Sequence, residues 1–142
     1  MGKEEFVSTP FPHQYKAYLE WQQDRLATIS AAEQPRLVGG PPPQFDGSNT
    51  HWSPEELLLS SIQLCLMTTF FSLTTRHKLV VHSYKSEIEG TLDKTANGLR
   101  FTRISLKVDL ESEDAGKARE VLQTAKKYCI ISNSLNVPVE LV

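Results

Sequence analysis

The chain has 142 residues, which is enough for one domain with a substantial core and too few for two ordinary domains. Its formal net charge is −2, and its charged residues are scattered, so it has neither the basic stripe that nucleic acids require nor a polybasic membrane segment. No apolar run of the signal-peptide type follows Met1, which predicts a cytoplasmic protein whose two cysteines are reduced at rest.

The N-terminal part of the chain predicts an arm followed by a hairpin. Residues 1–12 show no periodic pattern and are expected to form a flexible arm, and residues 13–142 are expected to form one domain. Alternating apolar and polar residues over 15–22 predict a first strand, and a short turn leads into a second strand at 26–30. The turn holds Arg25 near a strand end.

A third short strand is expected over 36–38, and the loop after it, from Gly39 to Trp52, is long for a compact domain. Such loops are often binding elements or lids. The three consecutive prolines of this loop are expected to form a rigid polyproline spacer. Phe45 and Trp52 either line an apolar pocket or simply pack the loop down.

The stretch 53–76 predicts one long helix with Cys65 near its middle. Its start, Ser53-Pro54-Glu55-Glu56, places an N-cap hydroxyl, an N1 proline and an N3 glutamate in the order of a capping box. Apolar residues then fall on nearly every side, which predicts a helix enclosed by protein. A core helix is preferred over a membrane span because the apolar run is short and contains many hydroxyl groups.

The C-terminal half predicts a long antiparallel hairpin, with strands over 80–92 and 99–110, an Asn97-Gly98 turn, and one buried face. A second helix is expected from a cap at 112–114 to about Tyr128. A turn region and a last short strand follow. The order of strands, helix, hairpin and helix indicates an α+β fold.

Cys65 and Cys129 form no CxxC pair, and no histidine has zinc-ligand spacing to them, so no metal site is expected. They are either two inert buried thiols or a spatially paired redox couple. A thiol attacks only as the thiolate, and burial in apolar surroundings raises the pKa of a thiol. The middle of a helix is also beyond the reach of the helix dipole. A reactive Cys65 therefore requires a cation from elsewhere in the fold.

The candidates for this cation are the arginines Arg25, Arg36, Arg76 and Arg103. Among the carboxylates, Glu55 precedes Cys65 by ten positions, about 15 Å along a continuous helix. If the two residues share a site, either the helix is interrupted or Glu55 comes from the partner subunit of a symmetric dimer. The remaining alternative is that Glu55 and Glu56 only cap the helix.

Three segments together resemble the OsmC/Ohr superfamily of thiol peroxidases. They are Ser53-Pro54-Glu55-Glu56-Leu57-Leu58-Leu59 followed by Cys65-Leu66-Met67-Thr68, Leu99-Arg100-Phe101-Thr102-Arg103-Ile104, and Cys129-Ile130-Ile131-Ser132-Asn133-Ser134-Leu135. The resemblance covers the chain from about Tyr15 to its end. It implies an OsmC-like α+β fold, in which antiparallel sheets wrap around the long central helices of an intertwined homodimer.

The resemblance also implies a reaction, the reduction of organic and possibly lipid hydroperoxides by two cysteines. On this pattern Cys65 is the peroxidatic cysteine and Cys129 the resolving one, while Arg25 activates the thiolate and Glu55 orients that arginine. No bound cofactor is implied. An external dithiol, in the hydroperoxide-resistance branch a protein-bound lipoyl group, resets the pair. The residues expected to line an apolar substrate pocket are Phe45, Trp52, Leu57, Leu58 and Ile62.

The sequence departs from the hydroperoxide-resistance branch at one informative position. Ile130 follows Cys129, where that branch usually has proline. The residues that flank Cys65 are also more similar to the broad OsmC-like group than to dedicated hydroperoxide reductases. An alternative function is therefore a dimeric OsmC-like module that binds a small apolar ligand and has little or no peroxidase activity.

Overall fold

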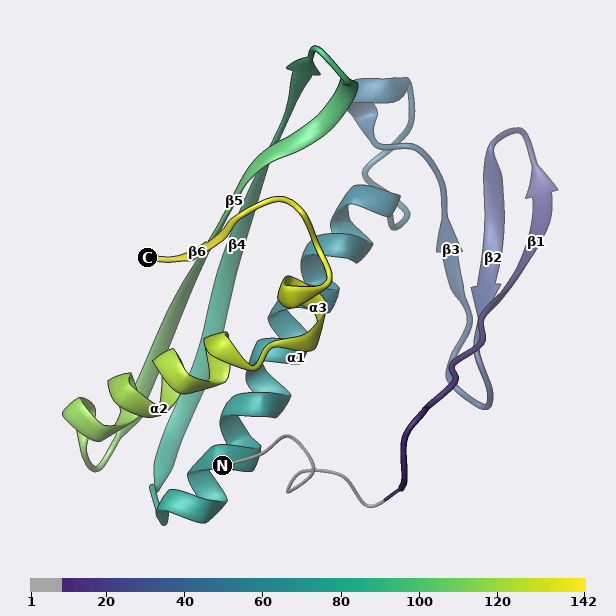
Figure 1. Ribbon diagram of the computed structural model, residues 1–142. Helices are drawn as coiled ribbons and strands as arrows, with labels where there is room; N and C mark the ends of the chain where they lie inside the picture. The colour runs from purple at the N-terminus through teal and green to yellow at the C-terminus, as the bar shows by residue number, and fades with distance from the viewer. Residues whose placement is uncertain (1–8) are drawn as a thin grey trace. The chain divides into compact units, whose positions relative to one another are not determined.

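The computed structural model describes residues 9–142, and its chain forms two compact units (Figure 1). The first unit extends to Leu58, and the second contains Leu59–Val142. The arm expected over residues 1–12 lies, as far as residue 8, outside the described residues. The element types and their order confirm the α+β fold expected from the sequence.

The first unit is built on a three-stranded antiparallel sheet with β2 (Leu26–Ser30) between β1 (Tyr18–Gln23) and β3 (Leu37–Gly39). The β1–β2 turn contains Asp24 at a positive φ of 49°, a conformation that aspartate tolerates better than most residues. The expected hairpin is therefore confirmed. The apolar side chains of β1 remain exposed, including 70% of Leu19 and 68% of Trp21.

The proline-rich loop forms a compact turn instead of the expected extended spacer. It contains the 3₁₀ helix η2 (Pro43–Phe45), and the N–H of Gly47 returns to the Pro42 carbonyl at 2.9 Å. The turn is tight, since a Cβ at Gly47 would lie 1.7 Å from the Pro41 carbonyl oxygen. Three prolines in a row favour polyproline geometry locally, but the glycine allows the chain to close back on them.

The helix α1 (Pro54–His77) begins with the predicted capping box. The Ser53 hydroxyl accepts a hydrogen bond from the Glu56 N–H at 3.1 Å, and the Ser53 N–H donates to Glu56 Oε1 at 3.2 Å. These bonds satisfy groups that a helix start otherwise leaves unpaired. The capping box and the helix are both confirmed, and α1 runs without interruption to His77.

The predicted enclosure of α1 is only partly provided by the described residues. The buried stripe, spaced at helical intervals, consists of Ile62, Leu66, Phe70, Leu73 and Thr74. On other sides, Leu64 is 59% exposed and Phe71 is 38% exposed. By length and composition alone α1 would also be long and apolar enough for a membrane span, a criterion that core helices of soluble proteins meet as well.

The second unit contains the long antiparallel hairpin of β4 (Val81–Thr95) and β5 (Gly98–Ser112). Its tight turn ends at Gly98, whose φ of 96° favours glycine. In Figure 1 the hairpin forms the long green pair of strands, and β6 (Val139–Leu141) is parallel to β5. The predicted hairpin and last strand are confirmed.

A bulge changes which residues of the hairpin face the core. Ile104 and Leu106 are buried as expected. The register shifts after Thr91, so that Leu92 lies opposite Phe101, and Thr102 is exposed. The single buried face expected for the hairpin is therefore not continuous along β5, because an extra residue in one strand reverses the alternation beyond it. Phe101 is half-buried instead.

Two helices complete the second unit. The N-cap of α2 (Ala115–Lys127) is Asp114, which accepts a hydrogen bond from the Lys117 N–H at 3.0 Å. The predicted second helix is confirmed, and its buried residues, spaced at helical intervals, are Ala118, Val121, Leu122 and Ala125. The single-turn helix α3 (Ile130–Asn133), which the sequence predicted only as a turn region, begins directly after Cys129.

Candidate active site

The residues predicted for the site fall in both compact units. The second unit contains Cys65, Cys129 and Ile62. The first contains the other predicted residues, which are Arg25, Phe45, Trp52, Glu55, Leu57 and Leu58. The sulfur atoms and the predicted charged groups thus belong to different units, and each group has its own surroundings.

The two cysteines lie together in the second unit. Cys65 is half-buried on α1, and Cys129 is fully buried at the N-cap of α3. Both are free thiols, and the Cys65 side chain is hydrogen-bonded to that of Cys129. The two side chains are therefore close in space, although 64 positions separate them in the sequence.

The start of α3 also contacts the Cys65 sulfur. The backbone N–H groups of Ile131 and Ile130 lie near enough to Cys65 to favour its thiolate form. Burial raises the pKa of the Cys65 thiol above its ordinary value, and the neighbouring Cys129 raises this pKa further, whereas the two N–H groups oppose the increase. The expected effect of burial is confirmed. The two N–H groups were not identified from the sequence because α3 was not predicted.

Cys129 accepts a hydrogen bond from a nearby serine. The Ser132 hydroxyl donates a hydrogen bond to Cys129 Sγ at 3.2 Å, and both residues are buried. Their separation by three positions, the spacing of one helical turn, is the only sequence signal for this contact. Ser132 was missed as a site residue because its hydroxyl also fits the expected turn.

Tyr84 on β4 is a second neighbour of Cys129 that sequence reasoning missed. Burial raises the pKa of Tyr84 to about 12, and Cys129 contributes to the increase. The Tyr84 hydroxyl is buried and has no hydrogen-bond partner within residues 9–142. Its ring centroid lies 5.4 Å from that of Phe70 and 5.6 Å from that of Phe71. Alternation along a strand predicts burial of such a tyrosine but not its position beside a cysteine.

The first unit contains an apolar cavity of about 460 Å³. Its walls come from the three strands, the proline-rich turn and the start of α1. Among the predicted pocket residues, those that line it are Phe45, Trp52 and Leu57. Leu58 is half-buried on α1, and Ile62 is fully buried in the stripe described above. Phe45 and Trp52 thus lie at the wall of a cavity, and their predicted contact with a substrate stays a prediction.

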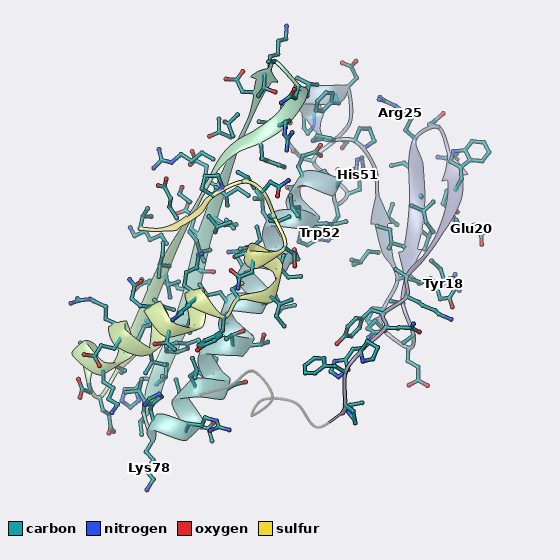
Figure 2. All side chains as sticks on the ribbon, viewed as in Figure 1. Tyr18, Glu20, Arg25, His51, Trp52 and Lys78 are labelled. Carbon is teal, nitrogen blue, oxygen red and sulfur yellow. The ribbon has the colours of Figure 1, made fainter. Side chains whose placement is uncertain are left out.

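Arg25 and Glu55 line the same cavity. Figure 2 shows Arg25 at the tip of the β1–β2 hairpin and Trp52 just before α1. The Arg25 guanidinium donates to the carbonyl oxygens of Phe45 and Asp46, both at 3.0 Å. Glu55 Oε1 is buried and, within residues 9–142, has no hydrogen-bond partner. The carboxylate that was expected to orient Arg25 does not bind it in this chain.

A further candidate cation has a partner elsewhere. Arg103, on β5, donates to Glu140 on β6 at 3.1 Å, and both side chains are at least half exposed. The pair links two neighbouring strands at the surface of the hairpin sheet. Among the candidate arginines, Arg25 lines the same cavity as Glu55, the carboxylate predicted for the site.

The chain is thus an α+β protein with two neighbouring free cysteines. It also has an apolar cavity that an arginine and a glutamate help to line. The family model described as OsmC-like protein matches residues 47–142, and the chain belongs to this family. The suspected OsmC/Ohr relationship and the OsmC-like fold are confirmed.

Comparisons with individual proteins agree with this assignment. The chain is 26% identical to the Uncharacterized protein YmaD of Bacillus subtilis (strain 168) over 106 residues, or 70% of this chain and 71% of the relative. An OsmC-like protein of unknown function from Vibrio cholerae superposes with a TM-score of 0.84 at 18% identity, covering 92% of this chain and 99% of that one.

Two further solved structures come from proteins with more specific names. An organic hydroperoxide resistance protein OsmC from Legionella pneumophila gives a TM-score of 0.77 at 18% identity, with 93% of this chain and 97% of that one covered. The organic hydroperoxide resistance protein OhrB of Bacillus subtilis gives 0.69 at 19% identity, with 91% and 96% covered. At these identities the structural likeness establishes the fold.

Proposed function

We propose that this protein is a thiol-dependent peroxidase that reduces organic hydroperoxides, with Cys65 as the peroxidatic and Cys129 as the resolving cysteine. The observation that carries the proposal is the contact between the two free thiols, one half-buried and one fully buried. The more accessible sulfur is the one that a hydroperoxide reaches first. Family membership and the names of two structural relatives support the same reaction class.

The chemistry requires three steps. The Cys65 thiolate attacks the terminal peroxide oxygen, the O–O bond breaks, and the alkoxide leaves and takes a proton to become the alcohol. Cys65 is then a sulfenic acid. The Cys129 sulfur attacks it, a disulfide forms and water leaves, which prevents further oxidation of Cys65. An external dithiol, for which we propose a protein-bound lipoyl group, reduces the disulfide by thiol exchange and becomes oxidised itself.

We propose that the working protein is a homodimer. Since α1 is continuous from Pro54 to His77, the interrupted helix is no longer an option for bringing Glu55 to Cys65. The remaining arrangement takes Glu55, with Arg25, from one subunit and Cys65 from the other. The exposed apolar residues Leu64 and Phe71 of α1 support a second chain as their cover. A monomeric mass in light scattering would contradict this proposal.

In this arrangement the cavity of the first unit binds the hydroperoxide. Its lining by Phe45, Trp52 and Leu57 suits an apolar organic group, including a lipid chain. Arg25 is the cation that lowers the pKa of Cys65, which burial alone raises. Arg25 already forms two hydrogen bonds to carbonyl oxygens, so its guanidinium is held at a defined place at the cavity wall.

A second candidate function is a module that binds a small apolar ligand without peroxidase activity. The observation that favours it is the missing pairing of Glu55 with Arg25, whose donors are engaged by the loop. In this case the cavity binds its ligand, and the raised pKa of Cys65 keeps the thiol protonated at neutral pH.

Thiol titration distinguishes the two functions. The fully reduced protein, freed of reductant, is treated with one equivalent of cumene hydroperoxide, and cumyl alcohol serves as the matched control without an O–O bond. We expect the loss of both thiols and a disulfide linking the tryptic peptides 37–76 and 128–142, while the alcohol has no effect. Unchanged thiols after the hydroperoxide would contradict the peroxidase and leave the binding module.

A further inference from the structure

The proline-rich turn, residues 41–47, forms part of the cavity wall but has few hydrogen-bond donors to offer its surroundings. Its first three residues are prolines, and proline has no backbone N–H. The N–H groups of residues 45–47 all bond to carbonyl oxygens inside the turn. Polar attachment of the turn to its surroundings therefore depends on donors from other parts of the chain, which bond its carbonyl oxygens.

Arg25 and His51 supply such donors. At the end of the turn, the Arg25 guanidinium donates to the carbonyl oxygens of Phe45 and Asp46. At its start, His51 Nε2 lies 2.8 Å from the carbonyl oxygen of Pro41. A carbonyl oxygen can only accept, so this hydrogen bond requires a hydrogen on Nε2. Figure 2 shows Arg25 at the hairpin tip and His51 on the segment before α1.

The backbone places the His51 ring against the start of the turn. The Gly40 N–H donates to the Trp52 carbonyl at 2.9 Å, and the Trp52 N–H donates to the Val38 carbonyl at 3.1 Å. A Cβ at Gly40 would lie 3.0 Å from His51 Nε2, so the glycine leaves room for the ring. His51 is half-buried there. The hydrogen bond to Pro41 thus joins two segments that the backbone already holds side by side.

The turn that His51 holds contributes Pro41, Pro42 and Phe45 to the cavity wall. His51 is not one of the described residues that line the cavity, so it acts on a bound ligand only through the turn. A wall that is already in place binds more tightly than one that binding must first order, because ordering a loop costs free energy. Holding the turn therefore favours ligand binding.

We propose that His51 is a positioning residue of the cavity: its Nε2–H holds the proline-rich turn, and the held turn forms the wall against which an apolar organic group binds. This inference deepens the proposed function and rests on it for its biological meaning, because the cavity is the one assigned to the hydroperoxide. Cumyl alcohol has no O–O bond, so its binding tests the role of His51 without any thiol reaction.

The first experiment uses the unmodified chain. Long-range proton–nitrogen NMR spectra of the ¹⁵N-labelled protein at pH 8 show which ring nitrogens of each histidine carry a hydrogen. We expect the hydrogen of His51 to be on Nε2, since only then does the ring donate to the Pro41 carbonyl. A His51 ring with its hydrogen on Nδ1 alone would overturn the proposal, even if no variant of His51 folds.

The second experiment measures binding in two variants of His51. His51→Leu has no donor, whereas His51→Gln retains a side-chain N–H. Cumyl alcohol is titrated into the labelled protein, and the indole N–H signal of Trp52, which lines the cavity, reports binding. The indole signal of Trp21, which is not among the described lining residues, is the internal reference. We expect the dissociation constant to increase about fivefold in His51→Leu, because one hydrogen bond is lost, and to recover in His51→Gln.

His13→Leu is the matched control. His13 Nε2 also lies within hydrogen-bond distance of a backbone carbonyl, that of Thr9 at 2.7 Å, but His13 is outside the described cavity lining. We expect its dissociation constant to be unchanged. Unchanged affinity in His51→Leu, a loss that His51→Gln does not restore, or an equal loss in His13→Leu would overturn the role of His51.

The outcome for His51 is separable from that for the peroxidase. If the unmodified protein does not bind cumyl alcohol, the cavity is not the binding site for an apolar group, and the inference fails with it. If binding depends on His51 as expected but the hydroperoxide leaves the thiols unchanged, the inference stands and only the peroxidase is contradicted.

Discussion

The region around Arg25 and the region around Cys65 differ in the kind of polar group that they contain. The first has a full positive charge, a buried carboxylate oxygen that has no hydrogen-bond partner among residues 9–142, and an apolar cavity. The second has two sulfurs whose described polar contacts are backbone N–H groups and a serine hydroxyl. Within residues 9–142, the proposed nucleophile lies in the second region and the proposed activating cation in the first, so the proposed reaction needs both regions.

This difference bears on how the Cys65 thiol could be activated. Neutral donors offset part of the effect of burial, but the pKa of Cys65 remains above its ordinary value. A cation is then the group that makes the thiolate available at neutral pH. If the two regions work together in a dimer, activation of the Cys65 thiol depends on dimer formation. Each region can then be tested by a substitution that leaves the other region unchanged.

The largest effect is expected from the cysteines themselves. Cys65→Ser should abolish oxidation by cumene hydroperoxide, because no accessible nucleophile remains. Cys129→Ser should still be oxidised, and with excess hydroperoxide it should accumulate sulfinic acid on Cys65, since no second sulfur intercepts the sulfenic acid. Mass spectrometry of the intact protein measures both outcomes. Oxidation of Cys65→Ser at the unmodified rate would exclude Cys65 as the peroxidatic residue.

The next effect tests whether the charged region acts on the sulfur region. In Arg25→Met the pKa of Cys65 should rise, the thiolate fraction at pH 7 should fall, and the midpoint of the rate against pH should move upward. Each increase of the Cys65 pKa by about one pH unit lowers the thiolate fraction at pH 7 about tenfold. Arg36→Met is the matched control, because Arg36 is another exposed arginine of the same unit.

The pH midpoint separates activation from a structural effect. Arg25 also holds the loop through Phe45 and Asp46, so a slower rate alone would not assign its role. A slower rate with an unchanged midpoint would mean that Arg25 only shapes the cavity. An equal upward shift in Arg36→Met would move the activating role to that residue.

The smallest effect concerns Tyr84, whose buried hydroxyl has no hydrogen-bond partner in the part of the chain that the structure describes. Tyr84→Phe removes this hydroxyl and keeps the ring against Phe70, so we expect the free energy of unfolding in urea to increase by about 1 kcal/mol. The control is Tyr18→Phe, which changes an exposed tyrosine. A decrease in stability would show that the assembled protein provides a partner for the Tyr84 hydroxyl.

Local patterns in the sequence were sufficient for most elements. The capping box at Ser53 and the Asn97-Gly98 turn each depend on a few adjacent residues, and both were predicted where they occur. The side of β5 that is buried beyond the bulge was not predicted. The alternation of buried and exposed residues reverses at an extra residue, and no local sequence pattern indicates that residue. The single turn α3 was missed for a related reason, as one turn has too few residues for periodicity.

The sequence by itself determined which residues have the chemistry of this protein: two cysteines, an arginine at a hairpin turn, a glutamate at a helix start, and the motifs that place the chain in the OsmC-like family. Only the tertiary structure decided that Cys65 and Cys129 come close together, and that the Ser132 hydroxyl donates to the Cys129 sulfur. The physical reason is that hydrogen bonds act over about 3 Å, whereas the residues that form them here come from elements far apart in sequence.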